Sequence, residues 1–124
     1  MSERRDLEII AGLVPPGSRV LDLGCGSGEL LAYLQRTRGC TGYGIELDDR
    51  NVLASVSRGV DVIQLNLEEG LALFDDASFD SVSLLDVLEH VADQQRLLAE
   101  VRRVLSPQGL LVVTVPGSHI FSFL

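Results

Sequence analysis

The stretch Val20-Leu21-Asp22-Leu23-Gly24-Cys25-Gly26-Ser27-Gly28 decides the fold. Its first four residues are an apolar run that predicts a strand, interrupted by one acid, Asp22. The three alternating glycines then predict a tight turn, in which a ligand can approach the backbone closely. Residues 29–38 carry leucines at helical spacing, so the turn opens onto a helix N-terminus with free N–H groups and a positive dipole end.

Strand-like and helical patterns alternate along the rest of the chain. Apolar runs predict strands at residues 20–23, 43–47, 62–65, 79–85 and 110–115. Helical spacing predicts helices at residues 3–14 and 29–38, a helix after the N-cap Asp48 with Val52, Leu53 and Val56 inward, and a helix with Leu97, Leu98, Val101, Val104 and Leu105 inward. Turns are expected at residues 71–74 and 106–109. This alternation predicts an α/β fold of three layers, a mostly parallel sheet with helices on both faces.

The composition fits a single globular domain over residues 1–124. Hydrophobic residues make up 46% and charged residues 23%, which excludes intrinsic disorder. The formal charge of -8 disfavours a nucleic-acid partner, since an acidic surface repels phosphates. Two cysteines and no histidine cluster predict neither a disulfide framework nor a metal site. No apolar run is long enough to span a membrane, so we expect a soluble, cytoplasmic protein with no membrane partner.

The glycine spacing separates two kinds of nucleotide site. The pattern is Gly-x-Gly-x-Gly, whereas the dinucleotide fingerprint is Gly-x-Gly-x-x-Gly. Asp22 precedes it, and an acid beside the ligand suits an amino or sulfonium group better than a pyrophosphate. A nicotinamide-dependent dehydrogenase on a related sheet therefore stays a disfavoured alternative.

The whole stretch closely resembles motif I of class I S-adenosylmethionine-dependent methyltransferases. Further pieces resemble later motifs of that family in order: Gly44-Ile45-Glu46-Leu47-Asp48, Leu65-Asn66-Leu67, Phe79-Asp80-Ser81-Val82, Asp86-Val87-Leu88-Glu89-His90-Val91 and Arg103-Val104-Leu105-Ser106-Pro107-Gln108-Gly109. The resemblance implies a Rossmann-like methyltransferase fold with seven strands, the last two antiparallel, of which this chain supplies about five. It also implies S-adenosylmethionine as the cofactor.

The two halves of the chain resemble different members of this family. Residues 6–74 most resemble MetW-type methionine-biosynthesis proteins, through Asp6-Leu7-Glu8-Ile9-Ile10, Val14-Pro15-Pro16-Gly17-Ser18 and Glu69-Gly70-Leu71. The second half, with Val115-Pro116-Gly117, looks like small-molecule or cell-surface-sugar methyltransferases. Two functions follow: a methyltransferase acting on a small molecule such as a sugar or lipid precursor, or a MetW-like non-catalytic partner protein in methionine biosynthesis.

Motif I implies binding roles at the end of the first strand. Gly24 and Gly26 would let the backbone approach the methionine part of the cofactor, and Asp22 would lie near its amino group. Cys25 sits at a helix N-terminus, where a thiol can be activated. The family often carries a small residue or Cys there, so we interpret Cys25 as part of the cofactor-binding turn and not as a nucleophile.

The later motifs imply contacts with the adenosine part. Glu46 would accept hydrogen bonds from both ribose hydroxyls, and it follows Gly28 by 18 residues, near the roughly 20 expected in such sheets. Leu47 adjoins it. Asn66 would face the adenine where the family often has Asp, and Leu67 would pack on the ring.

The fourth-strand motif implies one more contact, Leu85, whose backbone and side chain would lie beside the cofactor. The same motif holds a weak candidate for general-base catalysis, His90, because histidine titrates near neutral pH. Methyl transfer needs mostly in-line proximity, so the catalytic residue stays unassigned.

The chain ends on the apolar segment Ile120-Phe121-Ser122-Phe123-Leu124 without a stop signal, which suggests a fragment of a longer, C-terminally truncated protein. A bare fifth strand would expose an apolar sheet edge, which predicts self-association into a homodimer. The other expected partner is a small-molecule methyl acceptor.

Overall fold

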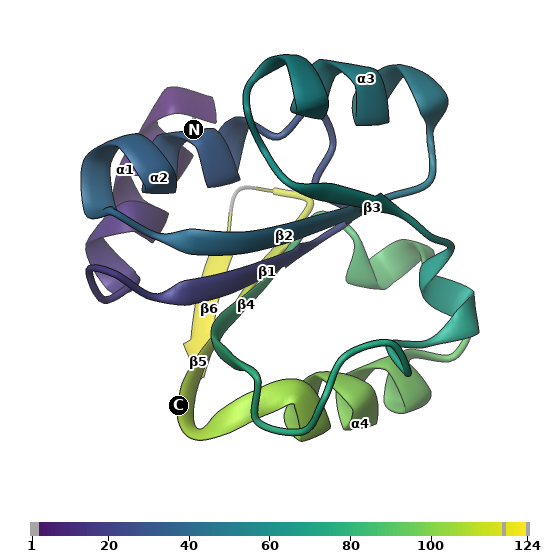
Figure 1. The fold of residues 1–124 in the computed structure, drawn as a ribbon. Coiled ribbons are helices and arrows are strands. Elements are labelled where there is room, and N and C mark those ends of the chain that lie inside the picture. Colours follow the sequence, from purple (N-terminus) through teal and green to yellow (C-terminus); the bar gives the residue numbers. More distant parts are fainter. Residues whose placement is uncertain (1–2, 118, 124) are drawn as a thin grey trace.

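A six-stranded sheet lies between two layers of helices in the computed structural model, which describes residues 3–117 and 119–123 (Figure 1). The strands are β1 (Arg19–Leu23), β2 (Thr41–Glu46), β3 (Val62–Gln64), β4 (Phe79–Leu85), β5 (Leu105–Val115) and β6 (His119–Phe123). The helices are α1 (Glu3–Leu13), α2 (Glu29–Arg38), α3 (Asp49–Ser57) and α4 (Gln94–Val104), with short 3-10 turns η1 (Leu67–Glu69) and η2 (Leu88–His90). The predicted three-layer α/β class is confirmed.

The strand order, β3-β2-β1-β4-β5-β6, reverses direction at β1. The chain runs from β1 outward to β3, returns to β4 on the other side of β1, and continues outward to β6. The pairs from β3 to β5 are parallel, and β6 is antiparallel to β5. The loops after β1, β2 and β4 therefore meet at one edge of the sheet, at the switch point where open α/β sheets bind ligands.

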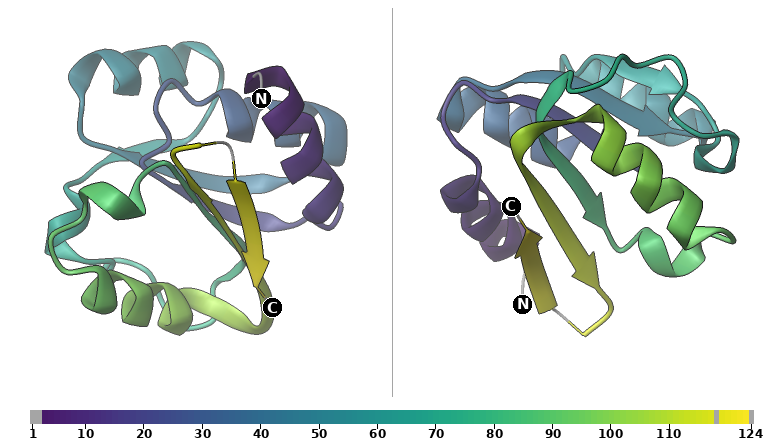
Figure 2. Two further views of the ribbon diagram at one scale, coloured as in Figure 1. Left: turned by 180° about the vertical axis from the view of Figure 1, so that it is seen from behind. Right: turned by 90° about the horizontal axis from the view of Figure 1, so that it is seen from below.

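Two apolar clusters pack on opposite faces of the sheet. On one face, Val20 packs with Leu31 and Leu34 of α2 and with Ile10 of α1. On the other face, the cluster includes Leu21 and Val82 of the sheet with Leu97, Val101 and Val104 of α4. The ribbon views show α1, α2 and α3 on one side of the sheet and α4 on the other (Figures 1 and 2).

The inward face of α3 differs from the prediction. Asp48 caps the helix as expected, because its side chain accepts hydrogen bonds from the backbone N–H groups of Arg50 and Asn51. Leu53 is 67% exposed and Val56 is 59% exposed, however, so the expectation that they point inward is wrong. The physical reason is that α3 packs on the glycine turn through its small buried residue Ser55, whose hydroxyl donates to the carbonyl of Gly26.

The C-terminal strands also differ from the prediction. The structure adds β6, which follows a turn at Pro116 and Gly117 and pairs with β5 from Leu111↔Phe123 to Val115↔His119. The fifth strand is therefore not bare, so the expectation of a bare β5 is wrong. Strand β6 now lies at that edge of the sheet, and self-association into a homodimer stays a prediction. Strand β5 begins earlier than predicted, at Leu105, so Leu105 belongs to the sheet and not to the inward face of α4 as expected. Residues 106–109 lie within β5 at an irregularity in its pairing with β4, so the separate turn predicted there is wrong.

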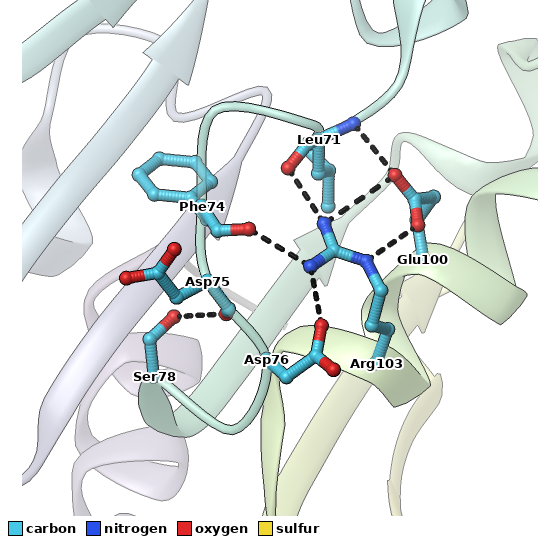
Figure 3. Close-up of polar contacts among 7 residues, drawn as sticks. All are labelled: Leu71, Phe74, Asp75, Asp76, Ser78, Glu100 and Arg103. Atoms are coloured by element: carbon cyan, nitrogen blue, oxygen red, sulfur yellow. Dashed lines mark hydrogen bonds and ion pairs between the residues drawn. The ribbon is translucent and has the colours of Figure 1, made fainter.

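One side chain, Arg103, binds the segment 71–76 that precedes β4 (Figure 3). Arg103 of α4 donates to the carbonyls of Leu71 and Phe74, each at 2.8 Å, and to the carboxylates of Glu100 at 2.8 Å and Asp76 at 2.9 Å. A 3-10 turn, η1, precedes the expected turn at residues 71–74.

None of the helices in the described ranges has the length and apolar character that a bilayer crossing requires.

Candidate functional site

The glycine turn after β1 is held against its neighbours by close packing. The backbone N–H of Cys25 donates to the carbonyl of Ile45 at 2.9 Å, which ties the turn to β2. A Cβ on Gly24 would lie 2.6 Å from Cγ2 of Val87, and Gly24 has φ +70°, so both space and conformation require glycine. A Cβ on Gly26 would meet no atom within 4 Å, so this part of the turn faces open space that a ligand can enter.

Glu46 connects the ends of two site elements. Its Oε1 accepts a hydrogen bond from the N–H of Gly26 at 2.8 Å, and its Oε2 accepts one from the N–H of Asp48 at 3.0 Å. Each carboxylate oxygen has a second lone pair, so the group can still accept from two adjacent hydroxyls. The backbone thus fixes the carboxylate in place before a diol binds.

Asp22 is a carboxylate in the interior of the sheet. It is 1% exposed, and Oγ of Ser83 donates to its Oδ1 at 2.7 Å. Burial raises the pKa of Asp22 to about 7 against the opposing effect of the Ser83 hydrogen bond, and the charge of Glu46 raises it further. A cation placed beside Asp22 would favour its ionised form, so this position suits an ammonium or sulfonium group.

Cys25 is buried beside Ser55, with its Sγ 3.8 Å from the Ser55 hydroxyl. Burial, together with the charge of Asp22, raises the pKa of the Cys25 thiol to about 11. The thiol is therefore protonated at neutral pH and is a poor nucleophile. A Cβ on Gly44 would lie 2.5 Å from its Sγ, which shows how closely Cys25 packs against β2.

All the predicted cofactor-binding residues line two adjoining cavities. The first, of about 270 Å³, is lined among others by Asp22, Gly24, Cys25, Gly26 and Leu85. The second, also about 270 Å³, is lined among others by Gly24, Glu46, Leu47, Asn66 and Leu67. Gly24 and Asp86 line both, so the two cavities meet beside the glycine turn.

Three residues of the second cavity have limited scope for binding. Oδ1 of Asn66 already accepts from the N–H of Glu68 at 3.0 Å, so its free amide N–H groups are donors. Leu47 is 57% exposed and lies just beyond the end of β2. His90 is exposed, and its Nε2 lies 3.8 Å from a carboxylate oxygen of Glu89. It lines the same cavity as Glu46, not the cavity of Asp22.

Sequence reasoning gave no role to two acids of the site. Asp86 follows β4 with φ +54°, a conformation that is uncommon outside glycine, and Thr114 holds it: the Thr114 hydroxyl accepts from its N–H at 2.9 Å and donates to its carboxylate at 3.2 Å. Asp6 of α1 lines the first cavity. Both lie within motifs that carry the resemblance, but neither the left-handed conformation nor the approach of α1 is visible in spacing.

A family model described as methionine biosynthesis protein MetW matches residues 4–118. The chain belongs to the MetW family. The match continues into the second half, beyond residues 6–74 where the sequence resemblance was strongest. Bifunctional methionine biosynthesis protein MetXA/MetW of Rhodopirellula baltica is 41% identical over 107 residues, which are 80% of this chain and 17% of that protein.

Methyltransferases are also similar to this MetW-family chain. The ubiquinone/menaquinone biosynthesis C-methyltransferase UbiE of Vibrio vulnificus is 37% identical over 116 residues, 86% of this chain and 44% of that protein. The crystal structure of a SAM-dependent methyltransferase from Thermotoga maritima superposes with a TM-score of 0.73 at 29% identity, over 87% of this chain and 48% of that one. The resemblance to class I S-adenosylmethionine-dependent methyltransferases is thus confirmed. The chain spans less than half the length of these relatives.

The residues present fit S-adenosylmethionine. The ligand has an adenosine end that carries a diol and an amino-acid end that carries an ammonium, a carboxylate and a sulfonium. The second cavity offers the fixed carboxylate of Glu46, and the first offers the buried carboxylate of Asp22. The described residues contain no group of three or more side chains arranged to hold a metal ion.

Proposed function

We propose that this MetW-family chain binds S-adenosylmethionine at the two cavities and belongs to a methyltransferase that acts on a small molecule. The observation that carries the proposal is the pair of adjoining cavities, with Glu46 in one and buried Asp22 in the other. A diol and a cation must lie on opposite sides of Gly24 to use both groups, and the cofactor has them in that order.

The residues act by holding and orienting the ligand. Asn66 and Leu67 would form the wall for the adenine, and Glu46 would accept hydrogen bonds from the ribose hydroxyls. Gly24, which lines both cavities, would leave room for the amino-acid part to reach the first cavity. S-adenosylmethionine, when bound, supplies a methyl group activated by a positive sulfur. The protein's contribution is alignment and exclusion of water, since in-line proximity accounts for much of such a rate acceleration.

Support for the acceptor class comes from the comparisons rather than from the cavities. The curated methyltransferase relative acts in quinone biosynthesis, which supports a small organic acceptor. We infer a small molecule such as a sugar or lipid precursor. A proton acceptor is not assigned, because His90 lines the second cavity, with Glu46, and not the first cavity, with Asp22.

A second candidate is favoured by the family match. The Rhodopirellula protein carries MetXA and MetW in one chain, which supports a MetW-like unit that works beside another enzyme of methionine biosynthesis. In this reading the cavities bind the cofactor for regulation or stability and no methyl group is transferred.

Calorimetric titration with S-adenosylmethionine and S-adenosylhomocysteine tests the proposal. We expect both to bind, and Glu46→Ala to weaken both. Glu69→Ala is the matched control, because Glu69 is an exposed acid that lines neither cavity. Absence of binding by the folded chain would refute the proposal. Binding without methyl transfer, together with co-purification of another enzyme of methionine biosynthesis, would favour the second candidate.

A further inference from the structure

Asp6 brings α1 into the first cavity. It is the fourth residue of α1, and Leu7 and Ile10 of the same helix line the cavity with it. The glycine turn and the start of α2 also line the cavity, through Gly26, Ser27 and Glu29 among others. A ligand that extends past the turn therefore meets the Asp6 carboxylate.

One oxygen of Asp6 is in an unfavourable state. Oδ1 is buried and accepts no hydrogen bond from the described part of the chain. An acid in the first turn of a helix is stabilised by the helix dipole, but that effect does not require a buried oxygen without a donor. An unsatisfied buried acceptor costs free energy, which the carboxylate would recover by turning this oxygen toward a donor in the cavity. Rotation about the terminal torsion of Asp is soft, so either oxygen can turn toward that donor.

The acidic lining of the first cavity favours a cationic hydrogen-bond donor. The described lining contains four acids and no basic side chain: Asp6, Asp22, Glu29 and Asp86. Such a lining attracts cations. The carboxylate of the cofactor's amino-acid part would face the N-terminus of α2, where the helix dipole favours negative charge. An ammonium group has three N–H donors, enough for Asp6, Asp22 and a backbone carbonyl at once.

We propose that Asp6 is a ligand of the cofactor and binds the α-ammonium group of its amino-acid part. This assignment rests on the proposed function, since it places that part of S-adenosylmethionine in the first cavity. Helix α1 then takes part in binding as well as in the fold: one face packs on the sheet through Ile10, and its first turn contributes a charged hydrogen-bond acceptor.

Two probes separate Asp6 from the rest of the site. S-adenosylhomocysteine carries the amino-acid part, whereas 5′-methylthioadenosine has the same adenosine and thioether without it. The calorimetric affinities of both are measured for the wild-type chain, Asp6→Asn, Glu46→Ala and the control Glu8→Gln, which removes a negative charge from an exposed position of α1. Thermal melting of each variant without ligand reports its stability.

We expect Asp6→Asn to weaken S-adenosylhomocysteine about tenfold or more, as for loss of a hydrogen bond to a charged group, and to leave 5′-methylthioadenosine unchanged. Glu46→Ala should weaken both probes, and Glu8→Gln neither. Equal losses of both probes in Asp6→Asn would overturn the proposal, as would no loss of either, since Asp6 would then be structural or uninvolved. Failure of the wild-type chain to bind either probe would instead refute the proposed function.

Discussion

Replacing Asp22 by Asn should remove a pH dependence of stability that wild-type protein shows between about pH 5 and pH 8. The buried carboxylate has a pKa raised to about 7, whereas in the unfolded chain it titrates near its ordinary value of 3.8. Between these two values the folded state binds more protons than the unfolded state. The free energy of unfolding therefore falls as the pH rises, and the loss is complete above the folded-state pKa.

The size of the effect follows from the two pKa values. Each unit of difference corresponds to about 1.4 kcal/mol, so the full effect of Asp22 is about 4 kcal/mol. About 3 kcal/mol of this falls between pH 5 and pH 8, because part of the loss occurs below pH 5. Asn keeps the shape and can accept the hydrogen bond from Ser83, but it has no charge to desolvate. We expect Asp22→Asn to be the more stable protein at the higher pH.

Urea denaturation of both proteins at several pH values measures this difference. The other titratable groups contribute to both proteins, so the difference between the two curves isolates Asp22. Parallel curves across the whole range would show that Asp22 is ionised at no unusual cost, and the argument from its burial would fail. Binding of S-adenosylmethionine to the wild-type protein near pH 6 should also release protons, which titration in buffers of different ionisation enthalpy detects.

Three further changes test the packing. Gly24→Ala should lower the free energy of unfolding by about 1–3 kcal/mol and abolish cofactor binding, because the new methyl group meets Val87 at 2.6 Å; denaturation and calorimetry measure the two effects. Arg103→Met should cost about 1–3 kcal/mol in urea denaturation, since it removes the guanidinium donor from the Phe74 carbonyl and leaves the Leu71 carbonyl and Glu100 with one backbone donor each. Leu53→Ser should change stability by less than about 0.5 kcal/mol, whereas Leu34→Ala should cost about 2–5 kcal/mol.

Each of these changes has an outcome that contradicts its premise. Normal cofactor affinity in Gly24→Ala would mean that the turn can move away from Val87 without harm. A neutral Arg103→Met would mean that water replaces the guanidinium at the carbonyls. A cost for Leu53→Ser similar to that of Leu34→Ala would mean that the exposed face of α3 is covered in solution.

The sequence predicts the central part of this fold well for a physical reason. The central strands are short segments rich in buried apolar residues, so β4 is predicted with its true bounds, and β1 begins within one residue of the prediction. The outer elements depend on contacts that spacing does not contain. Leu53 and Val56 of α3 look like an inward stripe, but close approach to Gly28 selects the small Ser55 as the buried residue.

Strand β6 escaped prediction because it has no pattern of its own. Its five residues follow Pro116 and Gly117 and are apolar or small at most positions, which alone fits a strand, a helix or an irregular tail. The decisive interaction is the ladder with β5, which is a tertiary contact. The same limit applies to Leu105, which continues the helical spacing of α4 but pairs with Phe79 in the sheet.

In the site, sequence motifs predict the position of the cofactor residues, whereas only the tertiary structure shows the partners of those residues. Motif order alone brings the predicted cofactor residues to two cavities, because parallel strands place their carboxyl ends at one edge. The groups that set the chemistry of those residues come from elsewhere. Ser83 on the neighbouring strand binds Asp22, and Thr114 on β5 holds Asp86 in its left-handed conformation. These partners are distant in sequence and follow from strand register.

The position of Asp22 inside the sheet is an argument about function as well as stability. A hydrophobic residue there would avoid the cost of burying a carboxylate, which is several kcal/mol without a compensating partner. Within the fold, Ser83 offers one hydrogen bond, and Glu46 opposes ionisation. The compensation therefore has to come from the cavity side, where a cation would restore the charge of Asp22. On this reasoning, cofactor affinity and the stability lost at high pH have one origin, so Asp22→Asn should gain stability and lose affinity for S-adenosylmethionine together.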